Sequence, residues 1–331
     1  MEDELPIQFF DDDPNIYLYV TGDRGKRWYY YNPESTPLGE GAMGKVFVGY
    51  DYETDQKVAI KMLFDKYSNN KSIRERAILE ASLSYSHPNL VEMLGSCMFQ
   101  DDEGDWHVWV LSNYVRGKNI DKKLKQQMDA NPNLDKVQTV SGYIMSVLDA
   151  LDYLHSKGVV HRDIKPSNIM VDDSGVVKLM DLGVARVTSA NSYTSMGFVG
   201  TPLYASPEQI LRDKTMVQAS PASDVYSLGM TFYVLLNGSN PFDAETEAQI
   251  LTNQVTKKLP ACQDIPKKYK KLLPVIWKAT DKNQEARYQT ALEFKMAIQK
   301  ALIPDKIPWW YWALGAAIIA IAVSIPLLIL L

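Results

Sequence analysis

A short segment near the middle of the chain carries side chains suited to the transfer of a phosphoryl group. It reads His161-Arg162-Asp163-Ile164-Lys165-Pro166-Ser167-Asn168. The Asp163 carboxylate can accept the proton of a substrate hydroxyl, and the Asn168 amide can hold Mg²⁺. Lys165 adds a fixed positive charge that stabilises the phosphoryl group as it moves. The segment therefore predicts phosphoryl transfer to a hydroxyl group.

A second carboxylate follows at a spacing that suits a shared metal ion. Asp181 comes thirteen residues after Asn168, at the end of a predicted strand over residues 176–180. Mg²⁺ is a hard cation that binds carboxylates together with substrate phosphates. Asn168 and Asp181 are therefore the predicted metal ligands.

A glycine-rich segment upstream has the pattern of a loop that covers phosphates. Residues 38–48 place Gly39, Gly41 and Gly44 in the order G-x-G-x-x-G-x-V. Glycine lets backbone amides approach phosphates because no Cβ intervenes. Dinucleotide-binding folds use a similar pattern, but there a helix follows the loop. Here residues 46–48 predict a strand, so the loop is expected to lie within a β-hairpin.

A lysine follows this loop on the next predicted strand. Residues 58–61 read Val-Ala-Ile-Lys, an alternating pattern that ends in Lys61. A lysine in this context pairs with nucleotide phosphates. An isolated lysine at a strand end is usually only solvated, but its place behind the glycine-rich loop makes Lys61 the predicted phosphate ligand.

The C-terminal end of the sequence has a different composition from the rest. Residues 309–331 begin Trp-Trp-Tyr-Trp, and the nineteen residues from 313 to 331 carry no charge. A helix of that length rises about 28 Å, close to the roughly 30 Å of a bilayer core. Lysines precede the segment and none follows, which places the preceding domain in the cytoplasm. We therefore expect a linker over residues 303–308 and a transmembrane helix over residues 309–331.

The overall composition narrows the class of protein. The 331 residues are 46% apolar and carry a net charge of −5, so no broad basic surface for nucleic acid is expected. Cys97 and Cys262 lie far apart without metal-ligand spacing, which predicts buried thiols in a reducing compartment. Residues 1–27 form an acidic and then aromatic segment, either a regulatory arm or a strand packed on the folded domain.

Taken in order, these motifs resemble the eukaryotic-type (Hanks-type) protein kinases, in the branch of bacterial membrane-bound serine/threonine kinases. The resemblance covers residues 28–302, the predicted kinase domain, and includes residues 200–208 and 223–229. By resemblance, Glu208 and Arg287 form a structural ion pair. Leu182 stands where the family more often has Phe, which we expect to shift the balance between active and inactive forms.

The resemblance implies an α+β fold, the bilobal protein kinase fold. A β-rich N-lobe lies over a helical C-lobe with ATP between them, and the C-terminal transmembrane helix follows. Backbone groups of Asn113 and Val115 would pair with adenine, and Ser112 would lie at the back of its pocket. The implied ATP-binding residues are Leu38, Gly39, Gly41, Gly44, Val46, Ala59, Lys61, Asn113, Val115 and Met170.

The resemblance also assigns a partner to the phosphate-binding lysine and a site of regulation. Glu80, nineteen residues after Lys61, is expected to hold that lysine, and Glu75 remains an alternative. Thr194 and Ser195 are predicted sites of autophosphorylation, since a phosphate there can pair with the guanidinium of Arg162.

The sequence thus predicts a protein serine/threonine kinase that uses ATP with Mg²⁺, or Mn²⁺ as an alternative, and phosphorylates Ser and Thr hydroxyls of proteins. Its catalytic residues would be Asp163, Lys165, Lys61 and Glu80. We expect it at the cell membrane, with its C-terminal helix among the lipids, its kinase domain cytoplasmic, and a homodimer supporting trans-autophosphorylation. The alternative is a pseudokinase that acts as a nucleotide sensor or membrane scaffold. Such proteins usually lose one of the chemical groups that are all retained here.

Overall fold

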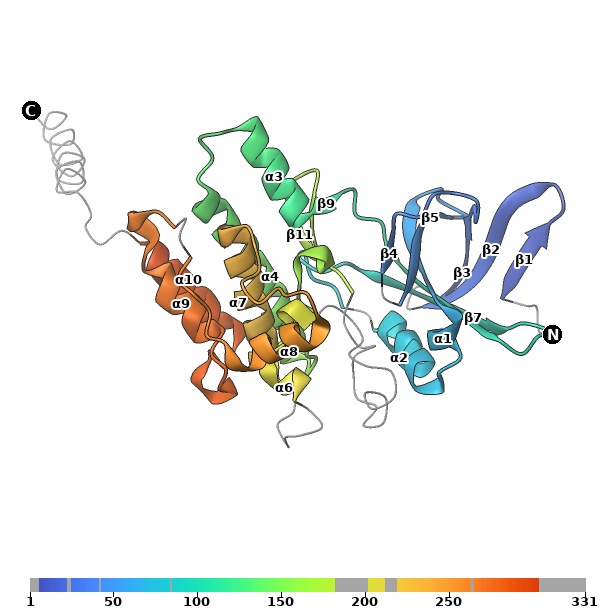
Figure 1. The fold of residues 1–331 in the computed structure, drawn as a ribbon. Coiled ribbons are helices and arrows are strands. Elements are labelled where there is room, and N and C mark those ends of the chain that lie inside the picture. Colours follow the sequence, from blue (N-terminus) through green and yellow to red (C-terminus); the bar gives the residue numbers. More distant parts are fainter. Residues whose placement is uncertain are drawn as a thin grey trace, which may run out of the picture.

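The structure, a computed structural model, describes residues 6–22, 25–41, 43–83, 85–181, 202–211, 219–262 and 265–303, without the side chains of Arg76 and Glu80. These residues form a sheet-rich N-lobe and a helix-rich C-lobe (Figure 1). The bilobal α+β architecture predicted from the sequence is confirmed.

The N-lobe is a curved antiparallel sheet. Its strands are β1 (Ile7–Phe10), β2 (Asp13–Gly22), β3 (Gly25–Tyr31), β4 (Gly39–Gly41), β5 (Gly44–Asp51), β6 (Lys57–Leu63), β7 (Met93–Gln100) and β8 (Trp106–Asn113). Their order is β1-β2-β3-β5-β6-β8-β7, and β4 pairs with β5. A further pairing of Thr21 in β2 with Ser96 in β7 closes the sheet into a barrel around Leu18, Ile60 and Leu111, which are fully buried.

The N-terminal segment therefore contributes strands to the N-lobe, the second of the two alternatives left open by the sequence. Alternate residues of β2 point into the core, where Leu18 and Val20 are buried. The predicted strands over residues 46–48 and 58–61 lie within β5 and β6. Helices α1 (Asp65–Ser68) and α2 (Lys71–Ser82) pack against β8, and α2 also packs against β7.

The C-lobe is built mainly from helices. Its elements are β9 (Gly117–Asn119), α3 (Ile120–Ala130), α4 (Lys136–Ser156), η1 (Pro166–Asn168), β10 (Ile169–Asp172), β11 (Val177–Leu179), η3 (Pro202–Tyr204), α6 (Pro207–Ile210), α7 (Pro221–Asn237), α8 (Glu247–Thr256), η4 (Lys267–Tyr269), α9 (Leu272–Ala279), η5 (Gln284–Ala286) and α10 (Ala291–Leu302). The short strands form a separate sheet, β11-β10-β9.

Helix α7 is the centre of the C-lobe and contacts α4, α9 and α10. It begins after the N-cap Ser220, whose hydroxyl accepts a hydrogen bond from the Ala222 N–H, and Pro221 fills its first position. It ends at Gly238, whose φ of +83° is a conformation that glycine adopts without strain. Nearly every side chain of α7 is buried, so this helix can carry polar groups into the interior.

Two predictions from the ends and the composition of the chain have different outcomes. Cys97 and Cys262 are free and buried, as predicted. Burial raises the pKa of the Cys97 thiol to about 12. Residues 309–331 lie outside the described residues. Within the described ranges, no helix combines the length and the apolar character needed to cross a membrane.

Candidate active site

A cavity of about 570 Å³ separates the two lobes. Every predicted ATP-binding residue except Asn113 lines it. The same cavity is lined from the C-lobe by Asp163, Lys165, Asn168 and Asp181. The structure therefore brings the nucleotide-binding and catalytic motifs together in one cleft.

The upper wall of the cleft is the β4–β5 hairpin together with β6. Gly39 faces Val46 and Gly41 faces Gly44 across the hairpin, and Val46 faces Lys61 in β6. A Cβ on Gly44 would lie 1.9 Å from the carbonyl oxygen of Met62, so only glycine allows β5 and β6 to approach this closely. The hairpin thus holds the glycine-rich loop over the lysine.

Lys61 reaches across the cleft to the C-lobe. Its Nζ lies 3.0 Å from Oδ2 of Asp181, and both side chains are partly exposed, at 29% and 47%. Glu75 is directed to the surface, where its carboxylate lies 3.8 Å from Nζ of Lys71. The side chain of Glu80, the predicted partner of Lys61, lies outside the described residues.

The catalytic segment places its three predicted groups in contact. The Asp163 carboxylate accepts hydrogen bonds from Nζ of Lys165 at 3.0 Å and from Nδ2 of Asn168 at 2.9 Å. The same Nδ2 also donates to the Asp163 carbonyl at 2.9 Å. Because the Asn168 amide nitrogen is used in this way, its amide oxygen is the atom suited to a metal ion.

The oxygen atoms of Asn168 and Asp181 fit a Mg²⁺ ion whose other ligands are mainly phosphate oxygens of the nucleotide. Asn168 can supply one amide oxygen and Asp181 one carboxylate. The backbone N–H of Met180, the residue before Asp181, donates to the backbone carbonyl of Asn168 at 2.8 Å. No group of three or more His, Cys, Asp or Glu side chains that could hold a metal ion occurs in the described part of the chain. Mg²⁺ typically binds one or two carboxylates and substrate phosphates rather than an all-protein cage.

His161 joins the catalytic segment to the strand that ends before Asp181. The ring is fully buried, and this burial lowers its pKa. Its Nδ1 accepts a hydrogen bond from the Asp163 N–H at 3.3 Å, so the proton lies on Nε2, which donates to the Met180 carbonyl at 3.0 Å. The imidazole is therefore a neutral spacer that positions two functional carboxylates.

Arg162 is held in a strained backbone conformation by two helices of the C-lobe. Its φ is +67°, in the left-handed region that non-glycine residues seldom adopt. The buried Asp224 of α7 accepts hydrogen bonds from the N–H groups of Arg162 at 2.7 Å and His161 at 2.8 Å. Gln209 of α6 donates from Nε2 to the Arg162 carbonyl at 2.9 Å. Both peptide groups that flank this residue are thus fixed, next to Asp163.

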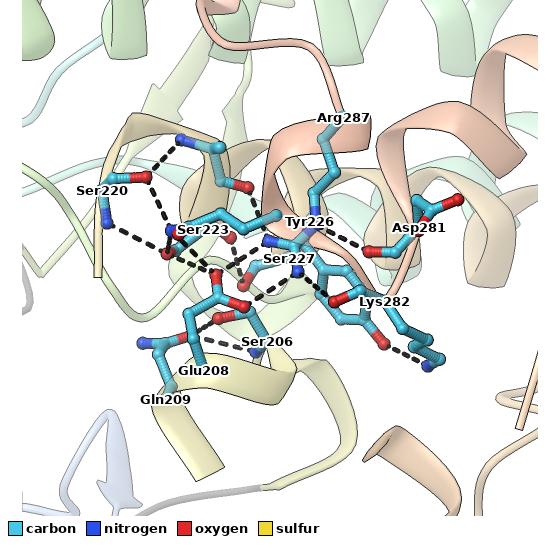
Figure 2. A network of polar contacts seen from close by, with 12 residues as sticks. Ser206, Glu208, Gln209, Ser220, Ser223, Tyr226, Ser227, Asp281, Lys282 and Arg287 are labelled. Atoms are coloured by element: carbon cyan, nitrogen blue, oxygen red, sulfur yellow. Dashed lines mark hydrogen bonds and ion pairs between the residues drawn. The ribbon is translucent and has the colours of Figure 1, made fainter. Parts of the chain in front are cut away.

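Helix α6 is itself fixed by a buried ion pair. Arg287 donates from Nη1 and Nη2 to the two carboxylate oxygens of Glu208, at 2.7 and 2.8 Å (Figure 2). Burial raises the pKa of Glu208, but the hydrogen bonds and charge of Arg287 and a 2.6 Å bond from Ser223 outweigh it, so the pKa lies below the ordinary value. The ion pair predicted by resemblance is confirmed.

The segment that would meet adenine has Ser112 and Val115 on the cavity wall. The Asn113 N–H donates to the Glu92 carbonyl at 2.9 Å, and its side chain donates to the Glu92 carboxylate at 2.8 Å. Only the Asn113 carbonyl therefore remains for the predicted adenine contact. Leu182, Thr194 and Ser195 lie outside the described residues.

Asp224 and Gln209 hold the catalytic segment in place, although no sequence motif assigns either residue this role. Asp224 lies inside a segment that resembled the family, and Gln209 follows directly after another such segment. Neither has a local pattern that indicates a contact with the catalytic segment.

Comparison with known proteins gives a consistent result. A family model described as "Protein kinase domain" matches residues 33–299. The chain is 34% identical over 276 residues to the probable serine/threonine-protein kinase PknB of Bifidobacterium longum, covering 79% of this chain and 38% of that protein. It is 31% identical over 277 residues to the serine/threonine-protein kinase PrkC of Bacillus subtilis, covering 82% and 40%. The chain thus spans less than half the length of these relatives.

Solved structures show the same fold. The kinase domain of Mycobacterium tuberculosis PknI aligns with a TM-score of 0.60 over 86% of this chain and 95% of that chain, at 22% sequence identity. A second solved structure of that domain gives a TM-score of 0.60 over 86% and 96%, at 21% identity. At these identities the likeness concerns the fold alone.

Proposed function

We propose that this chain, which belongs to the protein kinase family, transfers the γ-phosphoryl group of ATP to serine and threonine hydroxyls of proteins. The observation that carries the proposal is the grouping of Asp163, Lys165 and Asn168 in one cleft with the Lys61–Asp181 pair. A kinase requires a proton acceptor, phosphate ligands and a metal site at one place.

The reaction follows from these side chains. The substrate hydroxyl oxygen bonds to the γ-phosphorus, the bond from that phosphorus to the β,γ-bridging oxygen breaks, and ADP leaves. Asp163 orients the hydroxyl and takes its proton, while Lys165 stabilises the charge on the transferred group. Mg²⁺, when held by Asn168 and Asp181, supplies neutralisation of the phosphate charge.

The upper wall would position the nucleotide. Lys61 pairs with phosphates, and backbone amides of the glycine-rich loop lie over them. Val46, Ala59 and Met170 line the cavity and would form the apolar faces of an adenine pocket. Backbone groups of Asn113 and Val115 would then pair with the edge of the adenine. Positioning of this kind is the main catalytic contribution that a protein makes to phosphoryl transfer.

Serine/threonine specificity is supported by the names of the curated relatives, which are serine/threonine-protein kinases. Autophosphorylation at Thr194 or Ser195 in a homodimer belongs to the same proposal, because a phosphate there can pair with Arg162. We expect mass spectrometry of an active preparation to find these hydroxyls modified. An unmodified segment in an active enzyme would contradict this part.

Membrane anchoring by residues 309–331 is the remaining part of the proposal. It is supported by the nineteen uncharged residues and the aromatic residues before them. A flotation assay with lipid vesicles is expected to recover the parent chain with the membranes. Ile319→Lys should weaken its insertion, because a lysine at a helix centre costs about 2.5–3.5 kcal/mol. Recovery of the parent away from the membranes would contradict anchoring.

The decisive experiment measures transfer of labelled phosphate from ATP-Mg²⁺ to a casein-type protein and to the chain itself. Full-length parent and Asp163→Asn are compared. We expect phosphoserine and phosphothreonine with the parent, and a rate lower by about 10²–10⁴ in the variant, as for loss of a proton-transfer group. Binding of ATP without transfer by the parent would overturn the proposal in favour of a nucleotide sensor or scaffold.

A further inference from the structure

Two lysines on the rim of the cleft have no part in the proposed reaction. Lys118 in β9 and Lys122 in α3 line the same cavity as Asp163 and Lys165. Both side chains are exposed. Neither ammonium group forms an ion pair or a hydrogen bond with any residue that the structure describes.

The other charged side chains that line the cavity are already matched by an opposite charge. Lys61 pairs with Asp181 and Lys165 pairs with Asp163, each at 3.0 Å. Glu40 lies 3.8 Å from Nζ of Lys45. Among the described residues, the two rim lysines therefore give the C-lobe side of the cleft an excess of positive charge.

The elements that carry the rim lysines lie next to the catalytic segment. Helix α3 packs against η1, the turn that contains Asn168, and β9 pairs with β10 next to it. A polypeptide whose hydroxyl reaches Asp163 along the C-lobe side of the cleft would pass Lys118 and Lys122. Lys123, by contrast, is engaged within the fold, since its Nζ donates to the Asp172 carbonyl at 3.3 Å.

One carboxylate, Asp121, lies between the rim lysines in the sequence, but it does not line the cavity. Burial and, to a smaller extent, the Asp121 carboxylate raise the pKa of Tyr204 to about 12. Asp121 therefore lies near Tyr204 in η3, where Asp243 is a second nearby carboxylate. Within residues 117–122, the charged side chains that line the cavity are therefore Lys118 and Lys122.

We propose that Lys118 and Lys122 select protein substrates with acidic side chains close to the phosphorylated hydroxyl. The proposal rests on the proposed kinase function and adds a substrate class to it. A glutamate or aspartate beside the hydroxyl is attracted by the exposed ammonium groups, and an arginine or lysine at the same place is repelled. Since both lysines are exposed, the selection should weaken as ionic strength rises.

The test uses the full-length chain and matched peptides with a single serine. Within each set, the peptides differ only by Glu, Gln or Arg at one flanking position. We expect kcat/KM to fall in the order Glu, Gln, Arg at one or more positions, by about two- to fivefold for each exposed charge pair. The preferred position then identifies the part of the peptide that passes the rim.

The second part of the test reverses the charge of the two rim lysines. The double variant Lys118→Glu/Lys122→Glu should reverse the order of the peptides and leave KM for ATP unchanged. Lys125→Glu is the matched control, because Lys125 is exposed on the same helix but does not line the cavity. It makes the same kind of charge change and should leave the order of the peptides as in the parent.

The outcomes separate this inference from the proposed function. Equal use of the three peptides by the parent, or a preference for arginine, would overturn the selection of acidic substrates while phosphotransfer stands. A double variant with a raised KM for ATP and an unchanged peptide order would assign the lysines to the nucleotide site and also overturn it. Failure of the parent to phosphorylate any peptide, protein or itself would instead remove the kinase function.

Discussion

The two walls of the cleft are built in different ways. The upper wall comes from neighbouring strands, and the groups proposed to bind phosphates lie within residues 38–61, where the Lys61 side chain is partly exposed to solvent. The lower wall is held from behind, because the buried Asp224 and the partly buried Gln209 contact the catalytic segment from other parts of the C-lobe, and the buried ring of His161 joins that segment to Met180. This difference suggests that the upper wall depends on local backbone geometry and the lower wall on a buried polar network. Damage to the two walls should therefore have different consequences.

The largest effect is expected where the lower wall is supported by a buried ion pair. Glu208→Gln leaves the Arg287 guanidinium, which is almost fully buried, without its counter-charge. Breaking a buried pair in this way costs about 3–5 kcal/mol. We expect the free energy of unfolding to fall by that amount in urea denaturation. Lys268→Gln, which removes an exposed pair with Asp135, should cost no more than about 1 kcal/mol.

The same substitution should change the response to acid. The pKa of Glu208 is lower in the folded chain than its ordinary value. Its ionised form therefore stabilises the fold above the ordinary carboxyl pKa, and this contribution is lost as pH falls through the lowered pKa. Glu208→Gln should remove that part of the acid dependence of stability. An unchanged acid dependence and a small loss of stability would show that the ion pair does not support the lower wall.

A substitution in the upper wall should reduce the rate with little effect on stability. Lys61→Met removes the charge proposed to bind the phosphates, together with its partly exposed pair with Asp181. Loss of one such electrostatic group costs about 10²–10³ in kcat, whereas a partly exposed pair contributes about 1 kcal/mol or less to folding. Steady-state kinetics and urea denaturation of the same preparation check both parts. A large loss of stability would remove the proposed contrast between the walls.

The upper wall could be predicted from the sequence because its parts are local. The glycine spacing, the strand that follows and Lys61 each have a pattern within a few residues, and the structure places them as predicted. The lower-wall motif could also be recognised, but its supports could not. Hydrogen bonds to Arg162 come from residues 62 and 47 positions away in the sequence, and no short pattern predicts such contacts.

The N-terminal strands could be predicted only as one of two alternatives, for a related reason. Within β2, residues 16–21 alternate between Ile, Leu or Val and Tyr or Thr, so both faces of the strand contain apolar or aromatic side chains. A period-two pattern with one polar face is the signal that identifies a half-buried strand. The pairing of Thr21 with Ser96, which closes the barrel, joins two strands far apart in the sequence.

A smaller effect is expected from Gln209, whose side chain links α6 to the catalytic segment. Gln209 accepts a hydrogen bond from the Ser206 N–H at 3.0 Å and donates one to the Arg162 carbonyl at 2.9 Å. Gln209→Glu keeps the shape, but an ionised carboxylate cannot donate to a carbonyl. Leaving the partly buried Arg162 carbonyl without this donor costs about 1.5 kcal/mol, in the lower half of the range for buried groups, so we expect kcat to fall about tenfold at alkaline pH.

The pH profile distinguishes positioning from simple loss of packing. A protonated glutamic acid can both donate to Arg162 and accept from Ser206, so the activity of Gln209→Glu relative to the parent should recover at mildly acidic pH. Gln209→Met has a similar size without these groups and should show no recovery. Equal pH dependence of the two variants would show that the side chain of Gln209 does not position the catalytic segment through this bond.

The smallest effect on the natural reaction, and the most selective one, is expected at the back of the adenine pocket. Ser112 lines the cavity and pairs with Ala59 of the upper wall, so two small side chains meet there. We expect inhibitors with a bulky group at the N6 position of adenine to bind the parent and to lose about 10- to 100-fold in affinity for Ser112→Met, because overfilling a packed site costs about 1–3 kcal/mol. The KM for ATP should change little, since ATP places no group beyond N6. Inhibition constants for a matched pair of inhibitors, with and without the bulky group, check this in both proteins. If the bulky inhibitor binds both proteins equally well, the space beside Ser112 is not part of the adenine pocket, and the upper wall is closed there by other side chains.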